Sequence, residues 1–334
     1  MKSKEKKSDM QVMLFDLIQK SLPHNIALVD EVSELLNVGT DATYRRIRGE
    51  KPISLEEAMK LCRHYQISID SLADIVPDND HIRCRYTPLN LENLESYLTF
   101  IKSIANNIEN TKYFPESEII LSAVDVPLLN ILSYSELIFL KLFSWSKTVY
   151  AYSSPYEEFV NQFNNSEIKK YHDKIVQNYL LIPSSEIWTT HTVDPILKLI
   201  DYHSELGHFS DGKLPLLFCE QLLDLLNKVQ TWAENGKKGA KNIRFSFYVS
   251  ETDIGSTFIL LKNAERSNCL IRLYTINGLN ISDERFCMET ESWLRNSAKR
   301  STLLSEASEK DRFKFFEAQR QKIRFLIEKI QKSF

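Results

Sequence analysis

The stretch from residue 28 to residue 74 constrains the fold of this 334-residue chain more than any other part of its sequence. Valine and leucine recur at helical spacing over residues 29–36, and the turn-forming run Asn37-Val38-Gly39 then interrupts the pattern. Gly39 is expected to supply the unusual backbone angles of a sharp turn. A second short helix, Asp41–Arg48, is expected directly afterwards. Two short helices joined so closely predict a helix-turn-helix, whose second helix enters the major groove of DNA.

The second helix is rich in arginine, and its pattern predicts an inward face and an outward face. Thr40 or Asp41 is expected to cap it. Tyr44 and Ile47 are one helical turn apart, so we expect both to face inward, with the threonine and the arginines facing outward or sideways. The cations would neutralise phosphates, while Thr43 and one or two arginines would reach base edges. The residues expected to contact DNA are Thr40, Asp41, Thr43, Arg45, Arg46, Arg48 and Lys51.

Three further runs extend the pattern: YRRIRGE at residues 44–50, ISLE at 53–56 and ISIDSL at 67–72. Together with Val38 in the turn, they resemble the Cro/C1-type (XRE) helix-turn-helix family over residues 9–76. The resemblance implies a five-helix domain that binds double-stranded DNA in a transcriptional regulator. It also implies that the helix carrying the arginines is the one that reads the bases.

Charge and cysteine usage limit the class of protein. The whole chain has a net charge of −3, so it lacks the overall basic character of many nucleic-acid-binding proteins. Arg45, Arg46, Arg48 and Lys51 nevertheless lie close together, and a binding face needs local charge rather than a basic total. The five cysteines form no CxxC pair and are expected to be reduced thiols. With no apolar run long enough to cross a membrane, we expect a cytoplasmic protein without a membrane partner.

The length of the chain exceeds that of a usual single core, so we expect two domains. They are a helix-turn-helix domain at 9–76 and a dimerisation or effector domain at 90–334, separated by a polar linker at 77–89. The expected fold class is mainly α. The N-terminal five-helix Cro/C1-like domain is followed by a larger α-helical region that ends in a small antiparallel β-sheet (α+β) and a C-terminal helix.

Periodicity locates the elements within both domains. Ser54 is expected to cap a helix, and Glu57 three residues on gives the spacing of a capping box. Asp70 or Ser71 is expected to begin a fifth short helix, Leu72–Val76, and residues Glu118–Val126 are either a strand or the start of a helix. Further helices are expected at Met10–Lys20, Leu128–Val149, Tyr156–Phe163, Glu167–Ile182, Asp194–Leu206, Leu214–Glu234, Glu291–Leu303 and Glu309–Lys332. Strands are expected at Ile243–Val249, Ser256–Leu261, Cys269–Thr275 and Glu284–Met288, with a hairpin turn at Asn277-Gly278.

A homodimer is expected because a single helix-turn-helix buries little surface on DNA, and two copies can read a palindrome. Apolar residues recur at heptad spacing from Leu91 to Ile108, which makes this helix the first choice for the dimer interface. The alternative is that the helix packs on its own C-terminal domain. The last helix, which is basic and amphipathic, is the second choice for the interface, although such a helix more often caps a domain.

We find no constellation that predicts catalysis, a metal or a cofactor. Asp201, His203, Glu205 and His208 crowd together, but the two histidines are separated by Gly207 and do not share a helix face. Cys219 and Cys269 have apolar neighbours and are expected to be buried and inert. The aromatic residues of the C-terminal region line either a ligand pocket or, more commonly, a core; they are Trp145, Tyr150, Tyr152, Trp188 and Trp232.

The sequence therefore favours a sequence-specific DNA-binding transcriptional regulator without enzymatic activity. Its C-terminal region would form the dimer and accept a small-molecule or protein effector. The alternative is a protein-interaction module that uses the helix-turn-helix fold to hold a protein partner.

Overall fold

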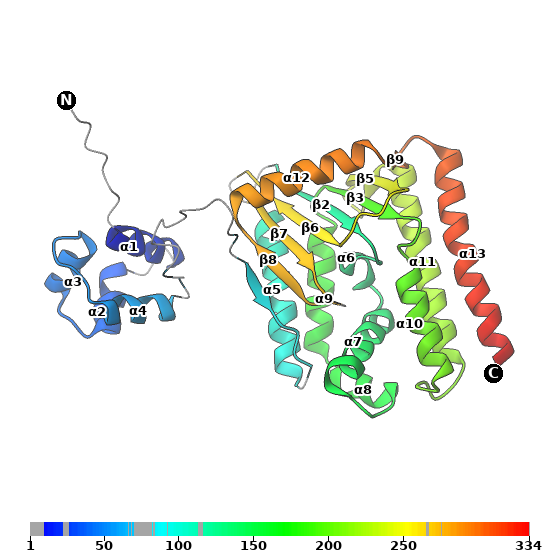
Figure 1. Cartoon of the computed structure of the whole chain (residues 1–334), viewed down its shortest axis with the longest axis horizontal. Helices are drawn as coiled ribbons and strands as arrows, with labels where there is room; N and C mark the ends of the chain where they lie inside the picture. The colour runs from blue at the N-terminus through cyan, green and yellow to red at the C-terminus, as the bar shows by residue number, and fades with distance from the viewer. Residues whose placement is uncertain are drawn as a thin grey trace. The chain divides into compact units, whose positions relative to one another are not determined.

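The chain divides into two compact units, Met1–His81 and Ile82–Phe334, in the computed structural model. The structure describes residues 10–22, 27–65, 67, 69, 82, 84–91, 93–112, 116–264, 267–274 and 276–333. Helices account for about 59% of it, and the remainder includes a mixed sheet, so the class is α+β. Each unit is described by itself (Figure 1).

The N-terminal unit is built from helices α1 (Met10–Ser21), α2 (Leu28–Leu36), α3 (Thr40–Ile47) and α4 (Leu55–His64). Their shared core contains Leu14, Phe15, Ile18, Val32 and Leu61. The short fifth helix expected at Leu72–Val76 lies outside the described residues. Four of the five expected helices are therefore in place.

The C-terminal unit is organised around a sheet of nine strands within the described residues, in the order β1-β8-β7-β6-β2-β3-β5-β4, with β9 also paired to β5. The strands are β1 (Arg85–Thr87), β2 (Glu118–Ala123), β3 (Ser184–Thr189), β4 (Lys237–Lys238), β5 (Ile243–Ser250), β6 (Phe258–Lys262), β7 (Ser267–Arg272), β8 (Gly278–Ile281) and β9 (Thr302–Leu303). β3 runs parallel to both β2 and β5, and the other pairs are antiparallel. The expectation of a small antiparallel sheet is wrong, since the sheet is larger and mixed.

The parallel strands explain why the sequence pattern underestimated the sheet. All residues of β3 but one are buried, so its sequence SSEIWT shows no alternation of polar and apolar residues. Strands that are covered on both faces lose this alternation, which is the usual sign of a strand. β1 falls within the predicted linker at 77–89 and pairs with β8, so the end of that stretch belongs to the sheet.

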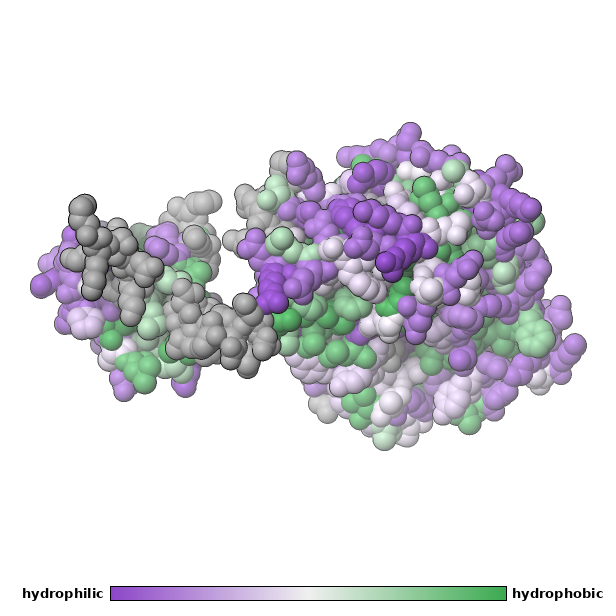
Figure 2. All heavy atoms as spheres, turned by 45° about the horizontal axis from the view of Figure 1, so that its top comes forward, coloured by the Kyte–Doolittle hydropathy of each residue, from purple (hydrophilic) through white to green (hydrophobic). Residues whose placement is uncertain are grey.

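Helices cover both faces of the sheet (Figure 1). In β2, Ile119 and Leu121 join the large core on one face, whereas Ile120 joins a smaller cluster with Leu260 and Leu294 on the other face. Leu294 belongs to α12 (Glu284–Lys299), which lies across that second face. With the side carrying α12 turned forward, Figure 2 shows mainly hydrophilic residues interspersed with smaller hydrophobic patches. Scattered apolar residues of this kind are normal on a protein surface.

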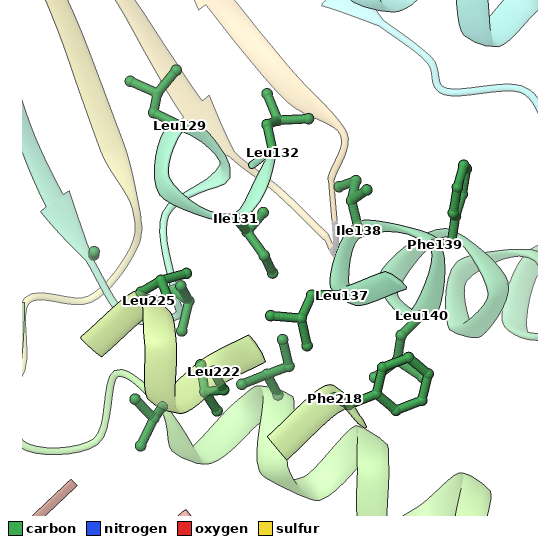
Figure 3. Packing of buried hydrophobic residues seen from close by; sticks show 14 of the residues in the cluster. Leu129, Ile131, Leu132, Leu137, Ile138, Phe139, Leu140, Phe218, Leu222 and Leu225 are labelled. Atoms are coloured by element: carbon green, nitrogen blue, oxygen red, sulfur yellow. The ribbon is translucent and has the colours of Figure 1, made fainter. Parts of the chain in front are cut away.

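The helices on the opposite face pack closely around the large core. They are α5 (Leu94–Lys112), α6 (Leu128–Ile131), α7 (Ser135–Tyr150), α8 (Tyr156–Phe163), α9 (Ser166–Tyr179), α10 (Asp194–Glu205), α11 (Lys213–Asn235) and α13 (Glu309–Ser333). Figure 3 shows Ile131 of α6 and Leu137 of α7 pointing toward Leu222 of α11. Glu118–Ala123 is a strand, which decides between the two alternatives for that stretch.

Two expected elements of the C-terminal unit are wrong. The helix expected over Leu128–Val149 is divided into α6 and α7, because Tyr134 has extended backbone angles and its hydroxyl donates to Asp224 of α11 at 2.7 Å. The strand expected at Glu284–Met288 is the start of α12. There the carboxylate of Asp283 accepts the backbone N–H of Phe286 at 2.8 Å and thereby caps the helix.

The heptad-spaced helix lies in the core of its own unit. Leu98 and Ile101 of α5 are buried, and so are Ala105 and Ile108. The expectation that this stripe forms a dimer interface is therefore wrong, because its apolar residues already pack against their own chain. The same core contains Trp145 and Trp188, so the core interpretation of these aromatic residues is confirmed.

A buried polar cluster surrounds Glu186 of β3. The carboxylate of Glu186 on β3 accepts the hydroxyl of Tyr179, the indole N–H of Trp188 at 3.1 Å and the amide of Asn130 at 3.2 Å. Beside it, the ammonium of Lys238 donates to Ser184 Oγ at 2.7 Å and lies 3.4 Å from the centre of the Tyr179 ring. Burial lowers the pKa of Lys238 to about 7, and the charge of Glu186 opposes the shift.

This lowered pKa predicts a pH-dependent stability. Between pH 7 and pH 9 the unfolded chain retains the Lys238 proton that the folded chain releases, so stability should rise with pH across this range. Relative to Lys238→Met, the parent should gain roughly 2 kcal/mol in the free energy of unfolding from pH 7 to pH 9, measured by urea denaturation. Lys237→Met, at the exposed neighbouring position, should leave the pH dependence unchanged. If the difference in free energy of unfolding between the parent and Lys238→Met did not change with pH, this would contradict the lowered pKa of Lys238.

Candidate nucleic-acid interface

The turn between α2 and α3 is closed by the backbone of α2. Asn37 takes the left-handed conformation (φ 54°, ψ 50°), and its N–H donates to the carbonyl of Glu34 at 3.2 Å. The N–H of Val38 then donates to the carbonyl of Ser33 at 3.1 Å. Such a left-handed residue ends many helices, and asparagine tolerates it well. Gly39 has ordinary extended angles, so the expectation that it supplies the unusual conformation is wrong.

Gly39 is also the N-cap residue of α3, in place of Thr40 or Asp41. Within the helix, the hydroxyl of Thr43 is completely buried, donates to the carbonyl of Gly39 at 3.2 Å and accepts the hydroxyl of Ser33 at 2.9 Å. These bonds fix α3 against α2. Thr43 therefore belongs to the inner face, contrary to the expectation that it would face outward.

Arg46 is also buried and joins α3 to α4. Its guanidinium contacts the carboxylate of Glu57 through Nη2 at 2.8 Å and through Nε at 3.4 Å. The side chains of Arg46 and Glu57 are 8% and 23% exposed, so the pair is largely removed from water. The hydrogen bond from Arg46 lowers the pKa of Glu57. The expectation of an outward-facing Arg46 is wrong, because its charge is already paired inside the unit.

The same glutamate holds the start of α4. Glu57 accepts the backbone N–H of Ser54 at 2.9 Å, and Ser54 Oγ accepts the N–H of Glu57 at 3.1 Å. This is the predicted capping box, and it is confirmed. Glu57 thereby connects the start of α4 with the last turn of α3.

The loop after α3 is held by α1. The side-chain amide of Gln11 donates to the carbonyls of Arg46 at 2.7 Å and Lys51 at 2.8 Å. Its oxygen accepts the N–H of Ile53 at 2.9 Å. Since three helices contact α3 or its adjoining loop, the position and rotation of α3 are fixed by the rest of the unit.

The opposite face of α3 is exposed. It carries Asp41, Tyr44, Arg45 and Arg48, which follow one another at helical spacing and which we call the exposed stripe. Tyr44 is 51% exposed, so the expectation that it faces inward is wrong, whereas Ile47 is partly buried against the core. Thr40, at the start of the helix, and Lys51, in the following loop, are exposed as well.

The two arginines of the exposed stripe share one weak partner. Arg45 and Arg48 approach the carboxylate of Glu50 at 3.8 Å and 3.3 Å, and their side chains are 65% and 61% exposed. Solvent-exposed ion pairs contribute at most about 1 kcal/mol, so a stronger anion readily replaces Glu50. Both guanidinium groups are therefore accessible to phosphate or to base edges.

The acidic and histidine residues of α10, and His208 just after it, make contacts within the C-terminal unit. Lys329 of α13 contacts Asp201 at 2.7 Å and Glu205 at 2.6 Å. His203 Nδ1 lies 2.8 Å from His208 Nδ1, and burial lowers the pKa of His203 to about 4. Within the described ranges, no group of three or more His, Cys, Asp and Glu residues could hold a metal. In the same part of the chain, no helix has the length and apolar content needed to span a bilayer.

The contrast between the buried Arg46 and the exposed Arg45 predicts unequal effects of their substitution on stability. Arg46→Ala should lower the free energy of unfolding of the N-terminal unit by about 1.5–3 kcal/mol, since it removes hydrogen bonds to a charged partner. Arg45→Ala, at the neighbouring exposed position, should change it by less than about 0.5 kcal/mol. Hydrogen exchange of the α3 and α4 amides in the full chain measures both effects. Equal protection in the two variants would contradict the structural role of Arg46.

Comparison of the chain with protein-family models, curated proteins and solved structures finds no match. We therefore infer the function from the residues of the N-terminal unit themselves. Among these residues, the exposed stripe faces solvent. The turn before α3, the core and the Arg46–Glu57 pair hold it in that position.

Proposed function

We propose that the chain is a sequence-specific DNA-binding transcriptional regulator whose α3 enters the major groove. One observation carries the proposal: on α3, the side chains that hold the fold and those that remain exposed lie on opposite faces. A recognition helix needs this separation, because its outer side chains must reach base edges while the rest of the domain stays folded. Contacts from α1, α2 and α4 hold the outer face in a fixed orientation.

The exposed residues divide by chemistry into base and phosphate contacts. Arg45 and Arg48 carry guanidinium groups that pair with guanine or with phosphate oxygens. Lys51 lies on the adjoining loop and suits a phosphate. Thr40 and Tyr44 present hydroxyl groups, and the carboxylate of Asp41 suits the amino group of cytosine rather than a phosphate.

Thr43 and Arg46, which the sequence predicted to contact DNA, are not DNA contacts in this proposal. Their polar groups already bond to Ser33 and Glu57, inside the unit. Recruiting Arg46 to DNA would leave the partly buried carboxylate of Glu57 without its main partner, which is costly. The proposed DNA-binding residues are thus Thr40, Asp41, Tyr44, Arg45, Arg48 and Lys51.

Tyr44 also favours a second candidate function. An exposed tyrosine beside arginines is typical of protein–protein interfaces, where both residue types are enriched. In this alternative, the exposed stripe holds a protein partner. The two candidates differ in salt dependence and in sequence selectivity for DNA, and the first experiment uses both differences.

DNA binding should be selective and sensitive to salt. In vitro selection from random duplexes with the full chain should enrich one site, and the logarithm of the binding constant should fall with the logarithm of salt by about 0.9 per phosphate neutralised. Arg45→Ala and Arg48→Ala should each weaken binding to that site by about 1–3 kcal/mol if they read bases. Arg63→Ala, at an exposed position on α4, is the matched control and should bind almost as the parent does.

Failure to enrich any site would overturn the proposal. So would equal binding by the parent and an Arg45→Ala/Arg48→Ala double variant. Either result would shift support to the protein-binding alternative.

A homodimer remains part of the proposal, and α13 becomes its interface. The apolar stripe of α5 is buried, whereas Phe325 of α13 is 72% exposed. A large aromatic residue at the centre of a helix face is a suitable anchor for a symmetric interface. Two copies joined in this way would present two α3 helices to a palindromic site.

Phe325→Glu should therefore convert a dimer into a monomer in sedimentation experiments. The substitution is at an exposed position and should leave the fold intact. Phe313→Glu is the matched control, since this 62% exposed residue of α13 lies about a third of a turn away around the helix axis. A Phe325→Glu variant that remains dimeric would place the interface elsewhere.

A further inference from the structure

A cavity of about 120 Å³ lies in the C-terminal unit between α5, the α6 region and strands β6, β7 and β8. Most of the side chains that line it are aliphatic. They include Ile104, Ile108, Leu129, Ile259, Leu270 and Ile276. An apolar cavity of about 150 Å³ binds benzene in another protein, so this somewhat smaller space suits an apolar group no larger than a benzene ring.

Two cations line the same cavity. Lys141 of α7 and Arg272 of β7 both contact Asp125, and both use the same oxygen: the Nζ and Nη1 atoms lie 2.6 Å and 2.8 Å from Oδ2. The side chains of Lys141, Arg272 and Asp125 are 4%, 23% and 8% exposed. The cations are therefore held in place by one carboxylate that does not itself line the cavity.

The cluster has more positive than negative charge. Two cations face one carboxylate, and no acidic residue is found among the described residues that line the cavity. Burial and the nearby charge of Arg272 lower the pKa of Lys141, whereas Asp125 opposes the shift. Because the two cations share a single carboxylate, a bound anion would balance the second positive charge and favour the protonated form of Lys141.

Apolar walls and an excess cation together specify the ligand. We propose that this cavity binds a small carboxylic acid, with its apolar body against the isoleucine and leucine side chains and its carboxylate on Lys141 and Arg272. Benzoate represents the class in size and charge. The site goes beyond DNA binding, since it lies wholly within the C-terminal unit and does not depend on α3.

The geometry distinguishes this site from a general anion site. Inorganic phosphate would need several further donors, and most of the cavity wall offers none. A neutral molecule of the same shape would fill the apolar space but leave the second positive charge unbalanced. Selectivity for a carboxylate over both competitors is therefore the signature of the proposed site.

Calorimetry on the full chain tests the proposal with benzoate, benzyl alcohol and inorganic phosphate as probes. Benzoate should bind at least about tenfold more tightly than either competitor, which corresponds to about 1.4 kcal/mol. Because no DNA is present, the result is independent of whether α3 recognises an operator. Absence of benzoate binding at millimolar concentration, or equal binding of benzoate and benzyl alcohol, would overturn the proposal.

Substitutions test the contributions of the positive charge and of the apolar space separately. Lys141→Met leaves Arg272 and Asp125 as a balanced pair, so the protein should fold and lose its preference for benzoate over benzyl alcohol. Lys147→Met on the same helix, at a position that does not line the cavity, should keep the preference. Ile104→Phe should fill the space and weaken both aromatic probes at least about tenfold, with the ion pairs intact. Retained benzoate selectivity in Lys141→Met would contradict the site.

Discussion

Burial of the central strands on both faces is the constraint on which the C-terminal unit depends. β2 and β3 are covered by the large core on one side and by the smaller cluster under α12 on the other. Their backbone N–H and C=O groups form hydrogen bonds within the sheet. Helices can therefore pack directly on both faces without leaving buried backbone groups unpaired. The polar side chains that remain inside, such as Glu186 and Lys238, must then find partners on neighbouring strands and on the helices that cover them.

How far the sequence predicts the fold depends on whether an element carries a local signal. Tyr156–Phe163 and the capping box at Ser54 were predicted because helical spacing and cap residues are visible within a few positions. β3 was missed because a strand buried on both faces has no alternation to detect. The sequence of β2 is ambiguous between strand and helix for the same reason, since all six of its residues are buried.

The candidate site shows the same limit at the level of single residues. Spacing placed the arginine-rich helix within one residue of α3, but it assigned Tyr44 to the core and Arg46 to solvent. A hydrophobicity pattern favours an aromatic residue over an arginine inside. It contains no information about Glu57, whose carboxylate, 11 residues further along the chain, makes burial of Arg46 favourable. The cavity beside Lys141 was equally hidden, because its walls come from segments far apart in sequence.

The separation of the two faces of α3 has a consequence for divergence between gene copies. Under the proposed function, Tyr44, Arg45 and Arg48 determine which operator is read, and they take little part in holding the unit together. Their replacement costs little stability, so a duplicated regulator can acquire a new operator through single substitutions. Positions 43 and 46 lack this freedom, because their side chains join α3 to α2 and α4. Paralogues should therefore vary along the exposed stripe while retaining the Ser33–Thr43 and Arg46–Glu57 contacts.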